Sequence, residues 1–318
     1  MRNVLTEYKA LILFKVLITA SMLVMGTYLL LNQQLNIGEF IAAEIIILTV
    51  INAIEKLIGS LDSVYDVITG LEKLANVTES SLEKSGKIHY VSNEKGMTVE
   101  LINCEIEFSS HHKVLQQLNF ILPSSSLICI TGDEGTGKTS LLNFLSGNYQ
   151  TENGGLLINN VPFQNYQIES LRNRMGIFLN QEDIFEGTVL DNITVGRNEI
   201  TVKKINEIAQ IIGFKSFINN FKNGFETILD PAGRKIASSL VTKILLLRAF
   251  VNEPELLLLE EPWRDFNQET KKSITEYLLQ LSRKTTICIV TNDEEFIAKC
   301  DYTIHLENNT GSLSKIIK

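Results

Sequence analysis

Two long apolar runs in the first sixty residues are the strongest constraint on how this chain folds. Residues 10–31 are mostly apolar, and at 1.5 Å rise per residue a helix of this length matches a hydrocarbon core of about 30 Å. A second, more polar run covers residues 40–58, after a short polar turn at 32–39. We predict a transmembrane hairpin. The alternative for the first run is a signal peptide, but the run is too long, contains Lys15 and is not followed by a small-residue cleavage site.

The distribution of charge predicts how the hairpin is oriented. The turn at 32–39 contains no lysine or arginine. Basic residues instead lie near the two ends of the hairpin: Arg2, Lys9, Lys15 and Lys56. Both ends are therefore expected on the cytoplasmic side. Glu44, Asn52 and Glu55 are costly in lipid and are predicted to face protein or a water-filled cavity. For Glu55 and Lys56, emergence into the headgroup region is at least an equal alternative, and Glu44 is the better candidate to line a cavity.

The remaining sequence divides into a linker and a soluble unit. Apolar residues keep a helical spacing after Ser60, so residues 1–77 are predicted to form a partial transmembrane domain whose second helix extends into the cytoplasm. Residues 78–96 lose this period and are predicted to be a linker. From residue 97 to 318, short β-like runs alternate with amphipathic stretches, which is typical of an α/β domain with a largely parallel sheet.

Composition excludes some functions. The net charge is −8, so no basic footprint for nucleic acid is present. The four cysteines are far apart in sequence and form no CxxC pair, so we expect buried thiols in a reducing compartment: Cys104, Cys129, Cys288 and Cys300.

The segment CITGDEGTGKTSLLNF predicts a phosphate-binding loop between a buried strand and a helix. Glycines allow main-chain N–H groups to turn toward phosphate oxygens, and the helix N-terminus adds its positive end. Lys138 is expected to reach the β- and γ-phosphates, and Thr139 to bind Mg²⁺. The sequence therefore predicts ATP or GTP binding by Gly132, Asp133, Glu134, Gly135, Thr136, Gly137, Lys138, Thr139 and Ser140.

Three further segments follow the phosphate loop in a characteristic order: QEDIFEGTVLDNI at 181–193, LLLLEEP at 256–262 and IVTND at 289–293. With these motifs, residues 97–318 resemble the nucleotide-binding domain of ATP-binding cassette (ABC) transporters. The hairpin, with its turn LNIGEFIAAE, resembles the last two of six membrane helices in an exporter-type half transporter. The resemblance implies a membrane α-helical hairpin followed by an α/β P-loop ABC domain.

The resemblance also implies roles for individual residues. Phe108 matches the aromatic residue that stacks on adenine, although a core phenylalanine is the alternative. Gln181 matches the glutamine that touches Mg²⁺ and the attacking water, and Glu261 matches the carboxylate that orients or deprotonates this water. Glu260 stands at the position of an aspartate that holds Mg²⁺ through water.

Several positions depart from the family pattern. Asn292 replaces the switch histidine and cannot carry a positive charge. The signature segment, usually LSGGQ, aligns with Ile236, Ala237, Ser238, Ser239 and Leu240. Ala237 lacks the serine hydroxyl that meets the ATP of a second subunit, and Asn267 replaces an aspartate. We therefore expect ATP and Mg²⁺ to bind, and hydrolysis by this chain alone to be weak.

These features predict an ATPase subunit of an exporter. The chain is expected to cross a bacterial inner membrane more than once and to hold its nucleotide-binding domain in the cytoplasm. Its expected partners are the lipid bilayer, a second ABC subunit in a hetero- or homodimer, and a transported substrate that the sequence does not identify. A hairpin alone cannot enclose a pathway, so a fuller partner chain or a longer gene product is required. A non-catalytic regulatory subunit is the alternative. A soluble ABC protein of DNA repair or translation is disfavoured by the apolar runs.

Overall fold

The structure is a computed structural model that describes residues 2–79, 83–92, 94–108, 112–149, 154–180, 183–214 and 217–316. The chain divides into two compact units, Met1–Glu83 and Lys84–Lys318. The first unit is a helical hairpin and the second is an α/β domain. Each unit is described separately below.

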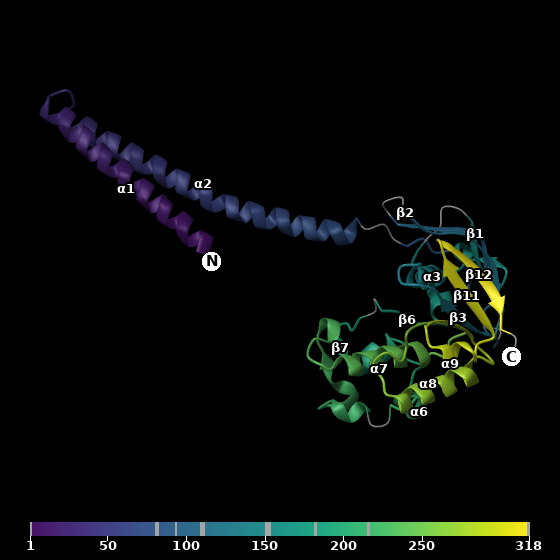
Figure 1. Cartoon of the computed structure of the whole chain (residues 1–318). Coiled ribbons are helices and arrows are strands. Elements are labelled where there is room, and N and C mark those ends of the chain that lie inside the picture. The colour runs from purple at the N-terminus through teal and green to yellow at the C-terminus, as the bar shows by residue number, and fades with distance from the viewer. Residues whose placement is uncertain are drawn as a thin grey trace. The chain divides into compact units, whose positions relative to one another are not determined.

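The hairpin consists of α1 (Arg2–Leu31) and α2 (Ile37–Thr78), which lie side by side (Figure 1). Ile12–Leu31 and Ile37–Leu57 are long and apolar enough to cross a membrane. Asn36 caps α2 in a reciprocal arrangement: its side chain accepts from the Glu39 N–H at 2.8 Å, and the Glu39 carboxylate accepts from the Asn36 N–H at 2.9 Å. These bonds satisfy N–H groups that have no partner within the helix, and so they fix where α2 begins.

Polar side chains join the two helices of the hairpin. Lys15 Nζ donates to Glu55 Oε2 at 3.1 Å and to Asn52 Oδ1 at 3.3 Å. Burying a charge in lipid is costly, and a partner of opposite charge lowers that cost. The structure therefore gives Glu55 and Asn52 a partner within the hairpin.

The α/β domain contains two main sheets. One has the strand order β2-β1-β4-β5 and is antiparallel, and the other has the order β12-β11-β3-β10-β9-β6. Within the second sheet all pairings are parallel except that between β11 and β12. The strands and main helices of the domain are β1 (Val99–Phe108), β2 (His112–Leu122), β3 (Leu127–Thr131), α3 (Lys138–Leu145), β4 (Gly155–Ile158), β5 (Val161–Pro162), α4 (Ile168–Arg172), β6 (Met175–Phe178), β7 (Gly187–Thr188), α5 (Val189–Thr194), α6 (Val202–Ile211), β8 (Ile228–Leu229), α7 (Ser238–Phe250), β9 (Leu256–Glu260), α8 (Gln268–Leu281), β10 (Thr286–Val290), α9 (Glu294–Ile297), β11 (Tyr302–Glu307) and β12 (Thr310–Lys315).

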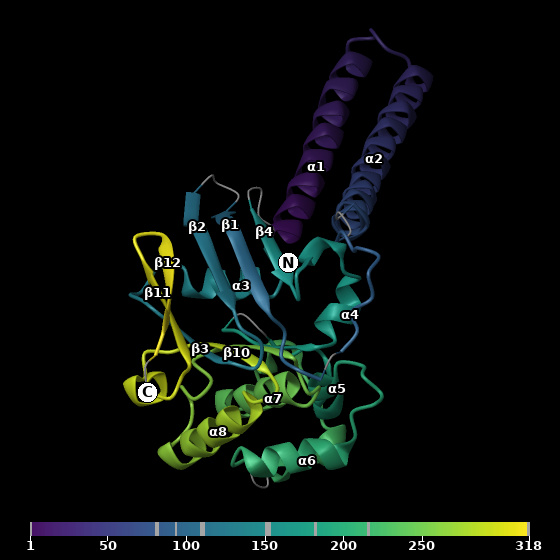
Figure 2. The ribbon, with the colours of Figure 1, turned by 90° about the vertical axis from the view of Figure 1, so that its right-hand side faces the viewer.

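The largely parallel sheet is covered on both faces (Figure 2). Alternate residues of β9 show this: Leu257 and Leu259 pack with the helices α6, α7 and α8, whereas Leu256 and Leu258 pack with α3 and the antiparallel sheet. A strand buried on both faces requires a continuous apolar run, which LLLLE provides. The run GLLI forms β4, which pairs antiparallel with β1 in the other sheet.

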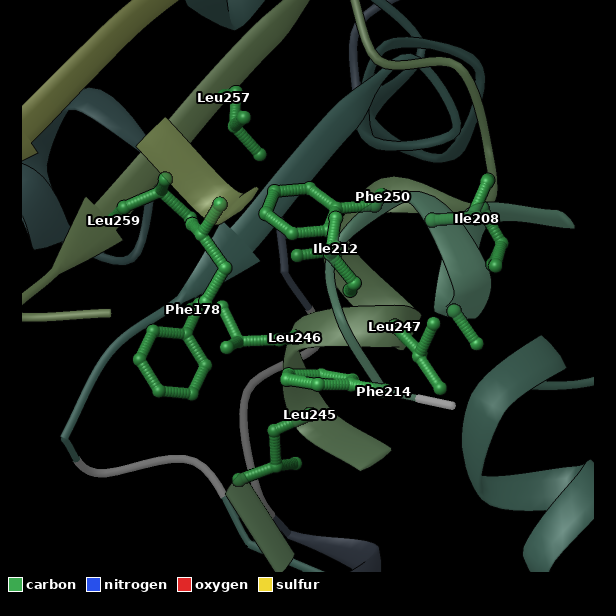
Figure 3. Packing of buried hydrophobic residues seen from close by; sticks show 14 of the residues in the cluster. Phe178, Ile208, Ile212, Phe214, Leu245, Leu246, Leu247, Phe250, Leu257 and Leu259 are labelled. Carbon is green, nitrogen blue, oxygen red and sulfur yellow. The ribbon is translucent and has the colours of Figure 1, made fainter. Parts of the chain in front are cut away.

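Figure 3 shows the core between the sheet and its helices, where Phe250 and the neighbouring leucines of α7 meet side chains of α6 and β9. Ile212 lies in this core with 0% of its surface exposed, whereas the adjacent Ile211 is 52% exposed. The two residues therefore differ in burial but not in type.

Residues that the sequence predicts as linker contact the α/β domain. The Gly86 N–H donates to Tyr166 O at 2.8 Å, and the Ile88 N–H donates to Asn165 O at 2.9 Å. The Tyr90 N–H donates to Ser170 Oγ at 2.9 Å. Residues 86–90 of the predicted linker therefore follow the α/β domain through hydrogen bonds of their main-chain N–H groups.

The expectation of four thiols is wrong for two of the cysteines. Cys129 of β3 and Cys300 form a disulfide, with Cα atoms 6.3 Å apart, while Cys104 and Cys288 are free and buried. Spacing along the sequence gave no sign of this pair, because parallel pairing of β11 with β3 brings residues 171 positions apart into contact range.

We expect Ile212→Ala to destabilise the domain by about 2–5 kcal/mol, because it removes buried methyl groups and leaves a cavity. Ile211→Ala is the matched control and should change stability by no more than about 0.5 kcal/mol. Thermal unfolding of the full chain in detergent measures both. Equal effects of the two substitutions would contradict the packing shown in Figure 3.

Candidate nucleotide-binding site

The predicted phosphate loop connects β3 to α3 and is shaped by glycines with positive φ. At Gly132 φ is +144°, and a Cβ atom there would lie 2.5 Å from the main-chain oxygen of Leu306 in β11. At Gly135 φ is +81°, but nothing lies within 4 Å of the position that a Cβ would take. Gly132 is thus required by the close approach of β11, and Gly135 by the turn itself.

Lys138 folds back across this loop. Its Nζ donates to Gly132 O at 2.8 Å and to Asp133 O at 2.5 Å. The ammonium group is therefore held beside the loop whose N–H groups are predicted to surround phosphate. A cation in this position neutralises the charge of a bound phosphate group.

Glu260 ends β9 and contacts the helix that follows the phosphate loop. Its Oε1 accepts a hydrogen bond from Thr139 Oγ1 at 2.5 Å, and its Oε2 accepts from the Asn180 N–H at 3.1 Å. Only 6% of the Glu260 surface is exposed. The structure thus brings together two of the three residues predicted to hold magnesium. Gln181, the third, lies outside the described residues.

Glu261 follows in an uncommon conformation, with φ of +44°. Its N–H donates to Val290 O at 3.0 Å, and its carboxylate accepts from the Asn292 N–H at 3.3 Å and from Thr291 Oγ1 at 3.5 Å. Burial raises the pKa of Glu261, and the hydrogen bonds with Asn292 and Thr291 and the charge of Arg264 oppose this rise only in part. A carboxylate with a raised pKa is a stronger base than an ordinary glutamate.

The predicted catalytic residues Glu261 and Asn292 are therefore neighbours, but it is the main chain of Asn292 that contacts Glu261. The Asn292 side chain is exposed. Phe108, predicted to stack on adenine, ends β1, and its side chain lies outside the described part of the structure.

The predicted signature segment lies at the start of α7. Ala237 is the N-cap residue and makes no side-chain capping bond, and Ser238 begins the helix. Ile236 and Ser238 line a cavity of about 370 Å³ together with Glu261 of the same chain. None of residues 132–140, all of which are described, lines this cavity.

Two residues of the site were given no role from the sequence. Asn180 lies one position before the segment QEDIFEGTVLDNI and contributes through its main chain, and Thr291 lies within IVTND and contributes its hydroxyl group. Asn267 replaces an expected aspartate and caps α8, because its side chain accepts from the Thr270 N–H at 2.9 Å.

Comparison with known proteins agrees with this geometry. Residues 115–264 match the family described as ABC transporter. The chain is 23% identical over 294 residues to the uncharacterized ABC transporter ATP-binding protein YwjA of Bacillus subtilis, covering 92% of this chain and 51% of that protein. It is 24% identical to the alpha-hemolysin translocation ATP-binding protein HlyB of Escherichia coli, covering 89% of this chain and 40% of HlyB.

The fold also resembles a solved structure, that of a bacterial Atm1-family ABC exporter with ATP bound. The TM-score is 0.68 at 19% identity, and the match covers 85% of this chain and 48% of the exporter chain. The chain is therefore similar to ABC transporter ATP-binding proteins, and the matched segment follows two helices that are long and apolar enough to cross a membrane. The chain spans about half the length of the curated relatives that it matches.

The residues present fit a magnesium ion. Thr139 and Glu260 offer hard oxygen donors, which Mg²⁺ prefers, and their contact shows that both reach the same point. Magnesium is commonly held by one or two carboxylates together with phosphate oxygens and water, so a large acidic cluster is not required.

We expect Glu260→Gln to weaken ATP binding about tenfold or more in the presence of Mg²⁺, because the amide keeps the size of the side chain but removes its charge. Binding in the presence of EDTA should change little. Equilibrium binding of a fluorescent ATP analogue with and without the metal measures this difference. Glu269→Gln, at an exposed position in α8, is the control, and an equal loss with and without metal would contradict the assignment.

Proposed function

We propose that this chain is the ATP-binding subunit of a bacterial inner-membrane exporter, in which Mg-ATP binding and slow hydrolysis change the arrangement of membrane helices. One observation carries the proposal: Thr139 donates to Glu260 at the end of β9, and the next residue, Glu261, lies at the same edge of the sheet. The same chain has two helices long enough to cross a membrane. The similarity to exporter-type proteins supports the same conclusion.

Each residue of the site has a chemical role in this proposal. The main chain of residues 132–137 and Lys138 bind the phosphates. Thr139 and Glu260 hold Mg²⁺, together with Gln181. When bound, the metal neutralises negative charge on the phosphates. Glu261 orients the attacking water and accepts its proton, a role favoured by the burial that raises its pKa.

The departures from the family pattern favour slow hydrolysis. Asn292 offers no positive charge to the γ-phosphate, and Ala237 offers no hydroxyl group to the nucleotide of a second subunit. Loss of one well-placed contact in the transition state typically costs about 2–4 kcal/mol, or two to three decades of rate. Two such losses would bring the rate of ATP hydrolysis by this chain close to the uncatalysed background rate.

A second ABC chain is the proposed partner. The predicted signature residues Ile236 and Ser238 line a cavity that none of residues 132–140, all of which are described, reaches. The partner would supply a signature segment that faces the ATP of this chain. The class of transported substrate is left open.

A non-catalytic regulatory subunit is the second candidate. The same departures at Ala237 and Asn292 favour it, because they leave the groups that bind the nucleotide in place. In this case ATP stabilises a closed dimer by linkage without being hydrolysed.

We expect the purified full chain in membranes to bind Mg-ATP and to release phosphate slowly, and Glu261→Gln to bind Mg-ATP normally without releasing phosphate. Glu294→Gln, at an exposed position in α9, is the matched control and should behave like the parent. A parent that binds without turnover indicates the regulatory subunit, whereas a parent that does not bind nucleotide would contradict both proposals.

A further inference from the structure

A lysine of α8, outside the nucleotide motifs, contacts the two segments on either side of the Glu261 carboxylate. Lys271 Nζ forms an ion pair with Asp293, the residue that follows Asn292. The same Nζ lies 5.8 Å from the centre of the Trp263 ring, two residues after Glu261. A cation over an indole face is attracted to it, so Lys271 binds both segments at once.

We propose that Lys271 is a positioning residue, which fixes the segment Thr291–Asp293 against Glu261 and links the nucleotide site to α8 and α9. This inference rests on the proposed function, because it concerns how the same site is kept in order. Lys271 does not touch the reacting atoms and is not a catalytic residue.

The contacts form a continuous series from Lys271 to the Glu261 carboxylate. Lys271 holds Asp293, whose own N–H donates to Thr291 Oγ1 at 3.2 Å. Thr291 Oγ1 and the Asn292 N–H both donate to the Glu261 carboxylate. A shift of Asp293 therefore changes the two bonds that orient Glu261.

Asp293 also fixes α9. Its Oδ1 accepts from the Phe296 N–H at 2.8 Å, so it is the N-cap residue of this helix. The Phe296 ring packs on Trp263, with centroids 4.7 Å apart. Burial raises the pKa of Asp293, but the hydrogen bonds from Lys271 and Phe296 outweigh this effect and hold its pKa below the ordinary value.

The burial of the pair distinguishes it from a solvated surface contact. The Lys271 and Asp293 side chains are 21% and 20% exposed, whereas those of the nearby pair Lys299 and Glu295 are 39% and 80% exposed. Exposed ion pairs contribute little because water competes for both partners. A pair that is mostly shielded from water holds its geometry more firmly.

Trp263 provides a direct reporter, since it is the only tryptophan of the chain. In the parent, saturating Mg-ATP should change the Trp263 emission. Lys271→Met should abolish most of this change and leave the affinity for a fluorescent ATP analogue within about twofold. Lys272→Met, the exposed neighbour on the same helix, should behave like the parent in both measurements.

One further variant separates positioning from folding. Lys271→Arg keeps the charge and can still contact both Asp293 and Trp263, so it should retain the emission change. A general folding defect caused by any substitution at this position predicts that Lys271→Arg also loses the change.

The outcomes are distinct from those that test the proposed function. The proposal is overturned if the parent binds the analogue but Trp263 emission does not respond, or if Lys271→Met responds like the parent. If the parent binds no nucleotide, the proposed function fails, and the positioning role fails with it.

Discussion

The order of strands in the parallel sheet is the constraint on which the site depends. Because β3, β10 and β9 are neighbours and run in the same direction, their carboxyl ends meet at one edge. This places the predicted phosphate loop, the segment after β10 and the two glutamates at the end of β9 close together. Ligands of open α/β sheets bind outside this edge. Burial of both faces in turn fixes the register of each strand, and so the position of each side chain.

The strand, loop and helix of residues 127–145 and the glutamates at the end of β9 could be predicted from the sequence because they depend on local residues. A strand, a glycine-rich turn and a helix can each be predicted from residues that are neighbours in the sequence. The four consecutive leucines of LLLLEEP likewise predict a strand that is buried on both faces. Contacts that depend on pairing across the sheet could not be predicted. The bond from Thr139 to Glu260 joins residues 121 positions apart. The disulfide of Cys129 and Cys300 and the contact of Lys271 with Asp293 arise in the same way.

The hairpin shows a similar division between local and long-range signals. Length and hydropathy predicted the two helices, and the capping of α2 by Asn36 follows from local residues. The sequence showed that Glu55 and Asn52 needed a polar environment, but it did not name Lys15 as their partner. Antiparallel packing of α1 and α2 supplies that partner from the other helix. Exposed apolar side chains such as Leu17 and Ile46 still need lipid or further helices to cover them.

The central claim is that one sheet edge binds Mg-ATP through the phosphate loop, Thr139 and Glu260. The most direct measurement is a cryo-electron microscopy structure of the full chain in a lipid nanodisc with Mg²⁺ and a non-hydrolysable ATP analogue. The account predicts phosphates surrounded by residues 132–137, with the metal beside Thr139 and Glu260 and the terminal phosphate facing Glu261. A nucleotide bound elsewhere, or a metal with no contact to Thr139 or Glu260 either directly or through water, would contradict it.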